Sequence, residues 1–318
     1  MRSLRLLWLL FAFALWPFAA QATNCAPVPP VQRDIDTGNF YTDKHHSVRD
    51  ESVWDENQSE MSDLNTFLAL ITSDADAFAG TGDKEARVCA LQALDAWGQS
   101  GALLGDMSNH GTLDRMWAVG AIALSVIKLG TPLKGPARNW FETVSNAVRQ
   151  DVEQRTAKSG VSNLTYWGAM AVGASGIVLG RADDWQFAQS GLRAGLDNIG
   201  ADGTLTREMG RGQRATHYQD YAAEPLVVLA RLSARQGAPL DADDHAKLDR
   251  LVTLVIAAAN NPQLLAQAAG TAQRPIKMPT YLVLWNKPQS GADAHDPIYV
   301  QLGGDTRILN SVLAKRSR

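Results

Sequence analysis

Apolar residues recur every three to four positions along most of the chain, the spacing that gathers them on one face of an α-helix. Several spans have start and stop signals: Gly130 ends one, Pro136 begins the next, and Gly180 ends another. The alternation typical of strands is scarce, and its clearest case is residues 281–285. The pattern predicts an all-α chain of about nine or ten helices in antiparallel hairpins. The predicted spans are residues 56–79, 84–104, 113–129, 136–156, 163–179, 183–195, 213–236, 241–260 and 307–315.

Small residues crowd the predicted helix over residues 163–179, where Gly168, Gly173 and Gly176 alternate with alanines. Such a surface lets a neighbouring backbone approach closely, so we expect this helix to lie inside the fold. Its first turn is polar and aromatic over residues 162–167. It would therefore present amide, hydroxyl and aromatic groups at the opening of any cleft that the helices enclose.

The first 22 residues predict a secretory signal peptide. Arg2 and Arg5 precede an apolar run over residues 6–19, and Ala20 and Ala22 form a small-x-small cleavage site. No later apolar run approaches the roughly 20 residues that a membrane helix needs. We therefore expect a periplasmic or secreted protein without membrane insertion. Residues 23–318 should form a single domain, because no linker or low-complexity tract divides them.

The charge balance excludes a general polyanion binder. The 318 residues include 30 basic and 33 acidic side chains, and removal of Arg2 and Arg5 with the signal peptide leaves 28 basic side chains against 33. Because the net charge is negative, we expect no nucleic-acid partner. An anionic ligand would have to be held by a local basic cleft.

Two cysteines, Cys25 and Cys89, remain after signal-peptide cleavage and would meet an oxidising compartment. One interpretation is a disulfide that ties the N-terminal segment to a helix. The other is a pair of unpaired buried thiols, and the residues alone leave both open.

The strongest chemical signal is the stretch over residues 211–221. At about 100° per residue, a helix places Arg214, His217, Tyr218 and Tyr221 on one polar and aromatic face. The apolar run begins only afterwards, at residues 225–229. A tyrosine beside a fixed guanidinium should ionise below its usual pKa of about 10, which would let it transfer protons. The alternative is a buried tyrosine and arginine that only satisfy hydrogen bonds.

Two further features suit the binding of a sugar chain. Residues 39–49 lack apolar periodicity and are rich in groups that bind carboxylates and hydroxyls, which predicts a functional loop. Several tryptophans fall near helix ends beside polar residues, where they could stack on pyranose rings, although core packing is the alternative for each of them. The tryptophans of the mature chain are Trp54, Trp97, Trp117, Trp140, Trp167, Trp185 and Trp285.

The sequence motifs exclude several classes of enzyme reaction. The six histidines show no metal-binding spacing, and there is no nucleophile elbow, P-loop or dinucleotide-binding glycine motif. We therefore expect neither a metal nor another cofactor. The remaining Asn, Arg, His and Tyr side chains suit β-elimination on a uronic-acid polymer. In that reaction Arg and Asn donors neutralise the carboxylate beside C5, and tyrosine transfers the protons at C5 and O4.

Several sequence blocks resemble the mannuronate-type alginate lyases, polysaccharide lyase family five, over most of the mature chain. The blocks are residues 40–43, 89–97, 101–104, 108–110, 162–167, 211–215 and 221–222, in this order. The resemblance implies an incomplete (α/α) toroid of antiparallel helical hairpins with a loop lid over a cleft. It implies a lyase acting on alginate or a related acidic polysaccharide, and a disulfide between Cys25 and Cys89. We also expect a monomer.

The resemblance assigns roles residue by residue. The arginine, tyrosine and asparagine of the family's catalytic group correspond to Arg214, Tyr221 and Asn163. We expect the substrate to contact a further set of polar and aromatic side chains. These are Tyr41, Lys44, His110, Trp167, Arg211, His217 and Tyr218.

One departure from the family pattern bears on catalysis. Leu164 stands where the family has a histidine that neutralises charge or takes the proton, and leucine does neither. Ser162 replaces an asparagine of the same block, and Gln219 and Asp220 replace a His-Asn pair. The leading hypothesis is a lyase in which Tyr221 serves as base and acid with partial help from His217. The alternative is a non-catalytic relative that binds polyuronate or takes part in its export.

Overall fold

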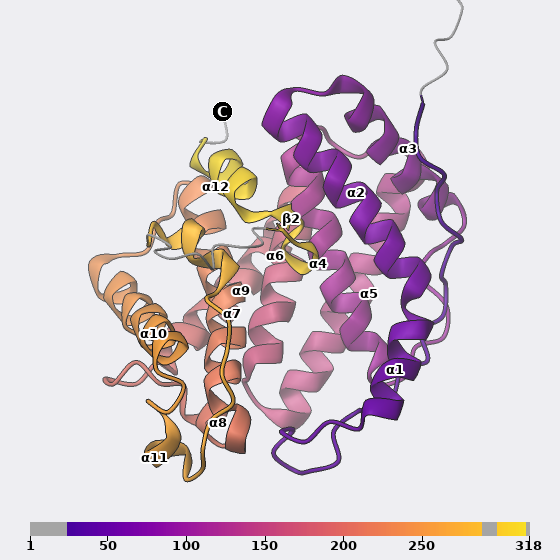
Figure 1. Ribbon diagram of the computed structural model, residues 1–318. Helices are drawn as coiled ribbons and strands as arrows, with labels where there is room; N and C mark the ends of the chain where they lie inside the picture. Colours follow the sequence, from indigo (N-terminus) through magenta and orange to yellow (C-terminus); the bar gives the residue numbers. More distant parts are fainter. Residues whose placement is uncertain (1–23, 288–297, 316–318) are drawn as a thin grey trace, which may run out of the picture.

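The computed structural model describes residues 24–287 and 298–315, so the predicted signal peptide lies outside the described residues. Helices pack side by side through most of the molecule (Figure 1). The longer helices are α1 Glu51–Glu60, α2 Ser62–Thr81, α3 Lys84–Gln99, α4 Gly111–Leu129, α5 Gly135–Ser159, α6 Asn163–Leu179, α7 Ala182–Asp197, α9 Ala215–Arg235, α10 Ala242–Asn260 and α12 Thr306–Ala314. Shorter elements are α8 Thr206–Met209, η1 Gly212–Arg214, α11 Ala266–Ala269, η2 Thr280–Trp285, β1 Ile298–Tyr299, η3 Val300–Leu302 and β2 Gly304–Asp305.

Helix α6 begins and ends where the sequence predicts. Ser162 and Thr165 form a capping box at its start, and Gly180 ends it in the left-handed conformation, with φ of 72°. The predicted span 56–79 instead contains two helices, α1 and α2, which meet at Met61. In these two regions, capping residues therefore predict the ends of helices more accurately than apolar periodicity alone.

The strand-like alternation over residues 281–285 does not form a strand. These residues make η2, a 3-10 helix that ends at Asn286 in the left-handed region, with φ of 53°. Within the described residues, β1 and β2 pair only with each other, so no strand is available beside this segment. Its alternation reflects the burial of Tyr281, Leu282 and Leu284 in the core.

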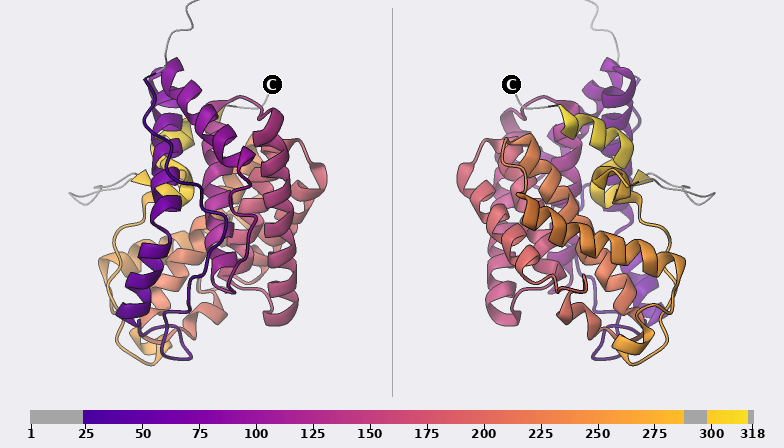
Figure 2. Two further views of the ribbon diagram at one scale, coloured as in Figure 1. Left: turned by 90° about the vertical axis from the view of Figure 1, so that its right-hand side faces the viewer. Right: turned by 90° about the vertical axis from the view of Figure 1, so that its left-hand side faces the viewer.

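Helix α6 is the inner helix that its small residues predict. It packs against α4, α5, α7 and α9. A Cβ atom at Gly173 would overlap Ala188 of α7, and one at Gly168 would overlap Val152 of α5, so only glycine allows these contacts. Farther out, α10 runs obliquely across the outer side of α9 (Figure 2).

The C-terminal segment returns to the first half of the chain, where α12 contacts α2 and α4. The ammonium of Lys128 in α4 is buried and pairs with Asp76 of α2 at 2.5 Å. It also donates to the backbone carbonyls of Gly303 and Asp305, at 2.7 and 3.1 Å. These contacts fix the segment that follows Tyr299.

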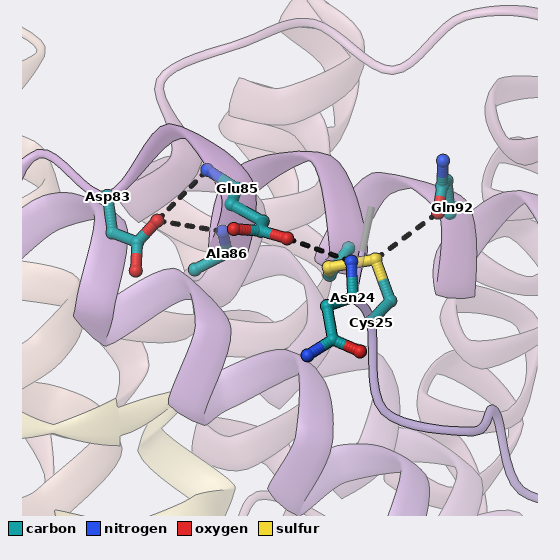
Figure 3. The surroundings of a disulfide bond; sticks show 7 residues. Asn24, Cys25, Asp83, Glu85, Ala86 and Gln92 are labelled. Atoms are coloured by element: carbon teal, nitrogen blue, oxygen red, sulfur yellow. Dashed lines mark hydrogen bonds between the residues drawn. A yellow bond between two sulfur atoms is a disulfide. The ribbon is translucent and has the colours of Figure 1, made fainter. Parts of the chain in front are cut away.

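The N-terminal segment is tied to α3 by a disulfide, which confirms the predicted pairing (Figure 3). Cys25 and Cys89 are bonded across a sequence separation of 64 residues. Beside the bond, the backbone amide of Asn24 donates to Glu85 at 2.8 Å, and Asp83 caps the start of α3. Such a crosslink typically stabilises a fold by about 2–4 kcal/mol.

Among the described residues, no helix combines the length and the apolar character that a membrane span requires.

Candidate active site

A cleft of about 450 Å³ lies beside the first half of α9. Arg214, His217 and Tyr221 line it together, as their helical spacing predicts. The other walls come from Arg49 at the end of the N-terminal loop, from residues 274–281 and from Tyr299 of β1. The remaining ionisable side chains that line the cleft are Asp220 and Glu224, also on α9, and Arg49, Arg274, Lys277, Tyr281 and Tyr299.

Tyr221 is positioned through its backbone by Trp167. Pro225 lies inside α9 and has no N–H, so the carbonyl of Tyr221, four residues earlier, lacks a helical donor. The indole Nε1 of Trp167 donates to that carbonyl at 3.0 Å. Trp167 is fully buried, and the substrate contact expected of it stays a prediction. In the structure its one polar atom is used by the bond to the Tyr221 carbonyl.

Other aromatic rings confine the Tyr221 side chain. The His217 ring stacks on it with centroids 5.9 Å apart and planes 15° apart. Trp117 and Tyr218 approach at 6.4 and 6.3 Å with their rings steeply tilted against it. The phenol therefore has little freedom to turn.

Arg214 pairs with Tyr41 rather than with Tyr221. Its Nη1 donates to the Tyr41 hydroxyl at 2.6 Å, and the guanidinium lies 5.4 Å from the centre of that ring. Arg214 belongs to η1, immediately before α9. The hydrogen bond thus joins the N-terminal loop to the residue that immediately precedes the helix carrying His217 and Tyr221.

The predicted functional loop folds back on the start of α9. His45 Nδ1 lies 2.8 Å from the backbone carbonyl of Gly210, and Gln213 donates to the carbonyl of Ser47 at 3.3 Å. Within the loop, the Asp43 carboxylate accepts from the amides of Ser47 and Val48, each at 2.7 Å. These bonds bring Tyr41 to Arg214.

Burial controls protonation in the cleft. Burial, then the neighbouring Tyr299 and Glu224, raise the pKa of Tyr221 well above its usual value. The prediction that Tyr221 ionises below its usual pKa is therefore wrong, because burial dominates and the Arg214 guanidinium is bonded to Tyr41. Burial and, next, the charge of Arg214 lower the pKa of His217 to about 3. Its imidazole is neutral at neutral pH, with one nitrogen to donate and one to accept.

Near neutral pH, the net charge of the cleft is more positive than a count of its acidic and basic side chains suggests. Burial raises the pKa of Asp220 to about 7, and burial together with Asp220 raises that of Glu224 well above its usual value. Both carboxyls thus lose much of their negative charge near neutral pH. The cationic side chains of the walls then attract an anionic chain. They are Arg49, Arg214, Arg274 and Lys277.

Seven of the predicted site residues do not line this cleft, and Tyr41 and Trp167, described above, are two of them. Asn163 is buried, and its amide nitrogen Nδ2 has no hydrogen-bond partner among the described residues. His110 packs edge-on against Phe40, with ring centres 5.3 Å apart. Arg211 pairs with Glu208 at 3.1 Å and lies over Tyr218, whose hydroxyl faces the backbone of His46. The last of the seven, Lys44, is exposed on the loop. The roles of all seven residues stay predictions.

Several wall residues were not predicted from the sequence. Glu224 was detectable, because it is a carboxyl at the edge of a buried apolar run, three residues after Tyr221. Arg274, Lys277 and Tyr299 lie in segments without periodicity, and only the three-dimensional fold brings them to α9. Across residues 24–287 and 298–315, no three His, Cys, Asp or Glu side chains are arranged to hold a metal ion.

Comparison with known proteins identifies the family. A family model described as alginate lyase matches residues 39–265. A polysaccharide lyase of Stenotrophomonas maltophilia is 31% identical over 308 residues, 92% of either chain. An alginate lyase of Pseudomonas aeruginosa is 26% identical over 273 residues, which cover 79% of this chain and 72% of that one.

Solved structures agree on the fold. A histidine-to-alanine variant of alginate lyase A1-III, an enzyme from Sphingomonas species A1, was solved as a complex with a tetrasaccharide. It matches with a TM-score of 0.74 at 18% identity, covering 93% of this chain and 87% of that one. The predicted (α/α) toroid fold is confirmed. Since the family model spans most of the chain and a relative above 30% identity matches nearly all of it, this protein belongs to the alginate lyase family.

Proposed function

We propose that this chain is a polysaccharide lyase that cleaves alginate, or a related polyuronate, by β-elimination at the 4-O-glycosidic bond. The observation that carries the proposal is the arrangement of Arg214, His217 and Tyr221 on one wall of a cationic cleft. The names of its relatives, which include alginate lyases, support an acidic polysaccharide as substrate.

The first requirement of β-elimination is neutralisation of the uronate carboxylate, because negative charge develops on it when C5 loses its proton. Arg214 is fixed by Tyr41 and supplies charge-assisted donors at the start of α9. The second donor that the family resemblance implies is Asn163, which lies outside the walls of this cleft and whose Nδ2 has no hydrogen-bond partner among the described residues. Both residues correspond to neutralising groups of the family, and the further histidine of the family is replaced here by Leu164.

The second requirement is proton transfer on one side of the sugar. Burial keeps the Tyr221 phenol protonated, so it serves as the acid that protonates the departing O4. The proton at C5 goes to a base on the same face, and neutral His217 has a free lone pair there. His217 thus provides an imidazole in place of the histidine that is missing at position 164. Apart from Leu164, the described residues of the cleft give no support to the non-catalytic alternative.

We further propose that residues 23–318 act as a single-domain monomer in the periplasm or outside the cell, after cleavage near Ala22. The disulfide between Cys25 and Cys89 supports an oxidising compartment. Light scattering and N-terminal sequencing of the exported protein test these two points.

The function is tested by incubating purified protein with polymannuronate, polyguluronate and polyglucuronate, and recording ultraviolet absorbance from unsaturated uronate ends. We expect a signal on at least one polymer. Binding to these polymers without any such signal would assign the chain to the non-catalytic relatives.

A further inference from the structure

Three polar groups on the walls of the cleft have no hydrogen-bond partner in the described part of the chain. They are Oδ1 of Asp220, Oε1 of Glu224 and the hydroxyl of Tyr281. Glu224 is only 6% exposed and Tyr281 only 1%. Buried polar groups are nearly always paired, so three unpaired groups at one place need an explanation.

These groups form one cluster on the cleft. Asp220 and Glu224 are one helical turn apart on α9, on the side that carries Tyr221. Tyr281 comes from η2, and its hydroxyl faces the Asp220 carboxyl without reaching a hydrogen bond of normal geometry. All three side chains line the same cleft.

A structural role does not account for the cluster. The buried Lys128 shows what such a role looks like here, since its ammonium has an acidic partner and two backbone carbonyls. By contrast, neither Asp220 nor Glu224 forms an ion pair with a basic residue of the described chain. The cluster therefore has unused hydrogen-bonding capacity next to the catalytic face.

The charge state of the cluster suits a polyanionic ligand. Burial keeps Glu224 protonated and Asp220 largely so below about pH 7. A neutral carboxyl does not repel a uronate, and it both donates and accepts hydrogen bonds. The charged and titratable groups that share the cleft with it are Arg49, Arg214, His217, Tyr221, Arg274, Lys277 and Tyr299.

We propose that Asp220, Glu224 and Tyr281 form a binding site for the ring hydroxyls of one uronate residue. A pyranose uronate has its carboxylate at C5 and its hydroxyls at C2 and C3, on the other edge of the ring. In a cleft that holds the carboxylate with cations, neutral donors and acceptors can bind the hydroxyl edge without repelling the carboxylate. Each hydroxyl donates once and accepts once or twice, which matches a carboxylic acid and a phenol. This inference rests on the proposed function and names the sugar groups that the same cleft recognises.

Calorimetric binding of a mannuronate tetrasaccharide tests the site. All proteins carry Tyr221→Phe, so that the ligand is not cleaved and binding is measured without reference to activity. Loss of one neutral hydrogen bond weakens binding roughly 3- to 10-fold, and we expect this for Glu224→Ala and for Asp220→Ala. Glu224→Gln should recover binding to within about threefold of the parent, because its amide keeps a donor and an acceptor in place. Glu153→Gln, an exposed change on α5, is the matched control.

Two readouts separate ligand binding from a structural role. The parent should bind more weakly as pH rises above about 7, where Asp220 ionises, and Asp220→Asn should remove this dependence. A tetrasaccharide whose hydroxyls have been chemically acylated should lose affinity for the parent but not for Glu224→Ala. The proposal is overturned if Glu224→Ala binds the tetrasaccharide with the affinity of the parent, or if acylation leaves the affinity of the parent unchanged. Absence of unsaturated ends in the wild-type assay would instead contradict the lyase function and leave these binding results intact.

Discussion

The indole Nε1 of Trp167 donates to the backbone carbonyl of Tyr221, 3.0 Å away, and so occupies the acceptor that Pro225 leaves without a helical donor. The bond joins the N-terminal part of α6 to the turn of α9 that carries Tyr221. A buried tryptophan and a proline inside a helix thereby act together to hold the backbone at Tyr221.

Replacing Trp167 with phenylalanine should lower kcat more than it changes KM. An aromatic ring remains, although phenyl is smaller than indole, and the Tyr221 carbonyl becomes a buried acceptor without a donor, which costs about 1–3 kcal/mol of folding stability. We expect kcat to fall roughly tenfold, because a small displacement of the phenol is enough to misplace the transferred proton. Steady-state kinetics with a urea unfolding curve measures both effects, and wild-type kcat in this variant would exclude a positioning role.

The hydroxyl of Tyr41 should matter through Arg214. Tyr41→Phe removes the acceptor of the 2.6 Å hydrogen bond and leaves the guanidinium free to move. We expect kcat/KM to fall about tenfold. The double variant Tyr41→Phe with Arg214→Gln should be no worse than Arg214→Gln alone, since the two groups act together. Independent, additive losses in this cycle would show that Tyr41 acts on the substrate by itself.

The sequence predicted the local parts of this site and missed its long-range contacts. The face shared by Arg214, His217 and Tyr221 follows from helical geometry, and the bounds of α6 follow from its caps. The bond between Tyr41 and Arg214 spans 173 residues, and no periodicity encodes it. The expected effect of Arg214 on the pKa of Tyr221 failed for the same reason, because the partner of the guanidinium lies on a distant loop.

Residue type and alternation do not by themselves decide burial or strand pairing. A tryptophan near a helix end suggests a sugar platform, and the structure shows that Trp167 is fully buried with its polar atom bonded to the backbone. The alternation of residues 281–285 suggested a strand, yet without a partner strand it becomes η2. Burial and strand pairing both depend on tertiary neighbours, which a single sequence does not display.

His217→Ala should reduce kcat/KM by about 100-fold or more if the imidazole takes the C5 proton. Since burial and Arg214 lower the pKa of His217 to about 3, its protonation does not change near neutrality. The loss should therefore stay constant from about pH 6 to about pH 8. His245→Ala, which alters an imidazole stacked on Trp285 outside the cleft, is the control. Full activity of His217→Ala would remove His217 from the mechanism.

Asp114 on α4 should make folding stability depend on pH. Burial raises its pKa to about 6, although Thr37 donates to the carboxylate. A raised pKa in the folded state means that stability is fully present below about pH 4 and is lost as pH rises through about 6. At about 1.4 kcal/mol per pKa unit, the loss is roughly 2–3 kcal/mol. Asp114→Asn should lack this pH-dependent loss. In urea unfolding at several pH values, the free energy of unfolding of the variant should therefore rise relative to that of the wild type as pH increases. A difference between the two proteins that does not change with pH would contradict this prediction.

The central claim is that Tyr221 transfers the proton in β-elimination, and it is tested most directly by Tyr221→Phe with rate and binding measured together. Tyr166→Phe is the matched control, because it removes a buried phenol that does not line the cleft. We expect Tyr221→Phe to form unsaturated uronate ends at least about 100-fold more slowly than the wild type, and Tyr166→Phe to stay close to it. Affinity of Tyr221→Phe for a mannuronate tetrasaccharide should change by no more than about threefold, roughly one weak hydrogen bond. A Tyr221→Phe variant that retains the wild-type rate would contradict the account.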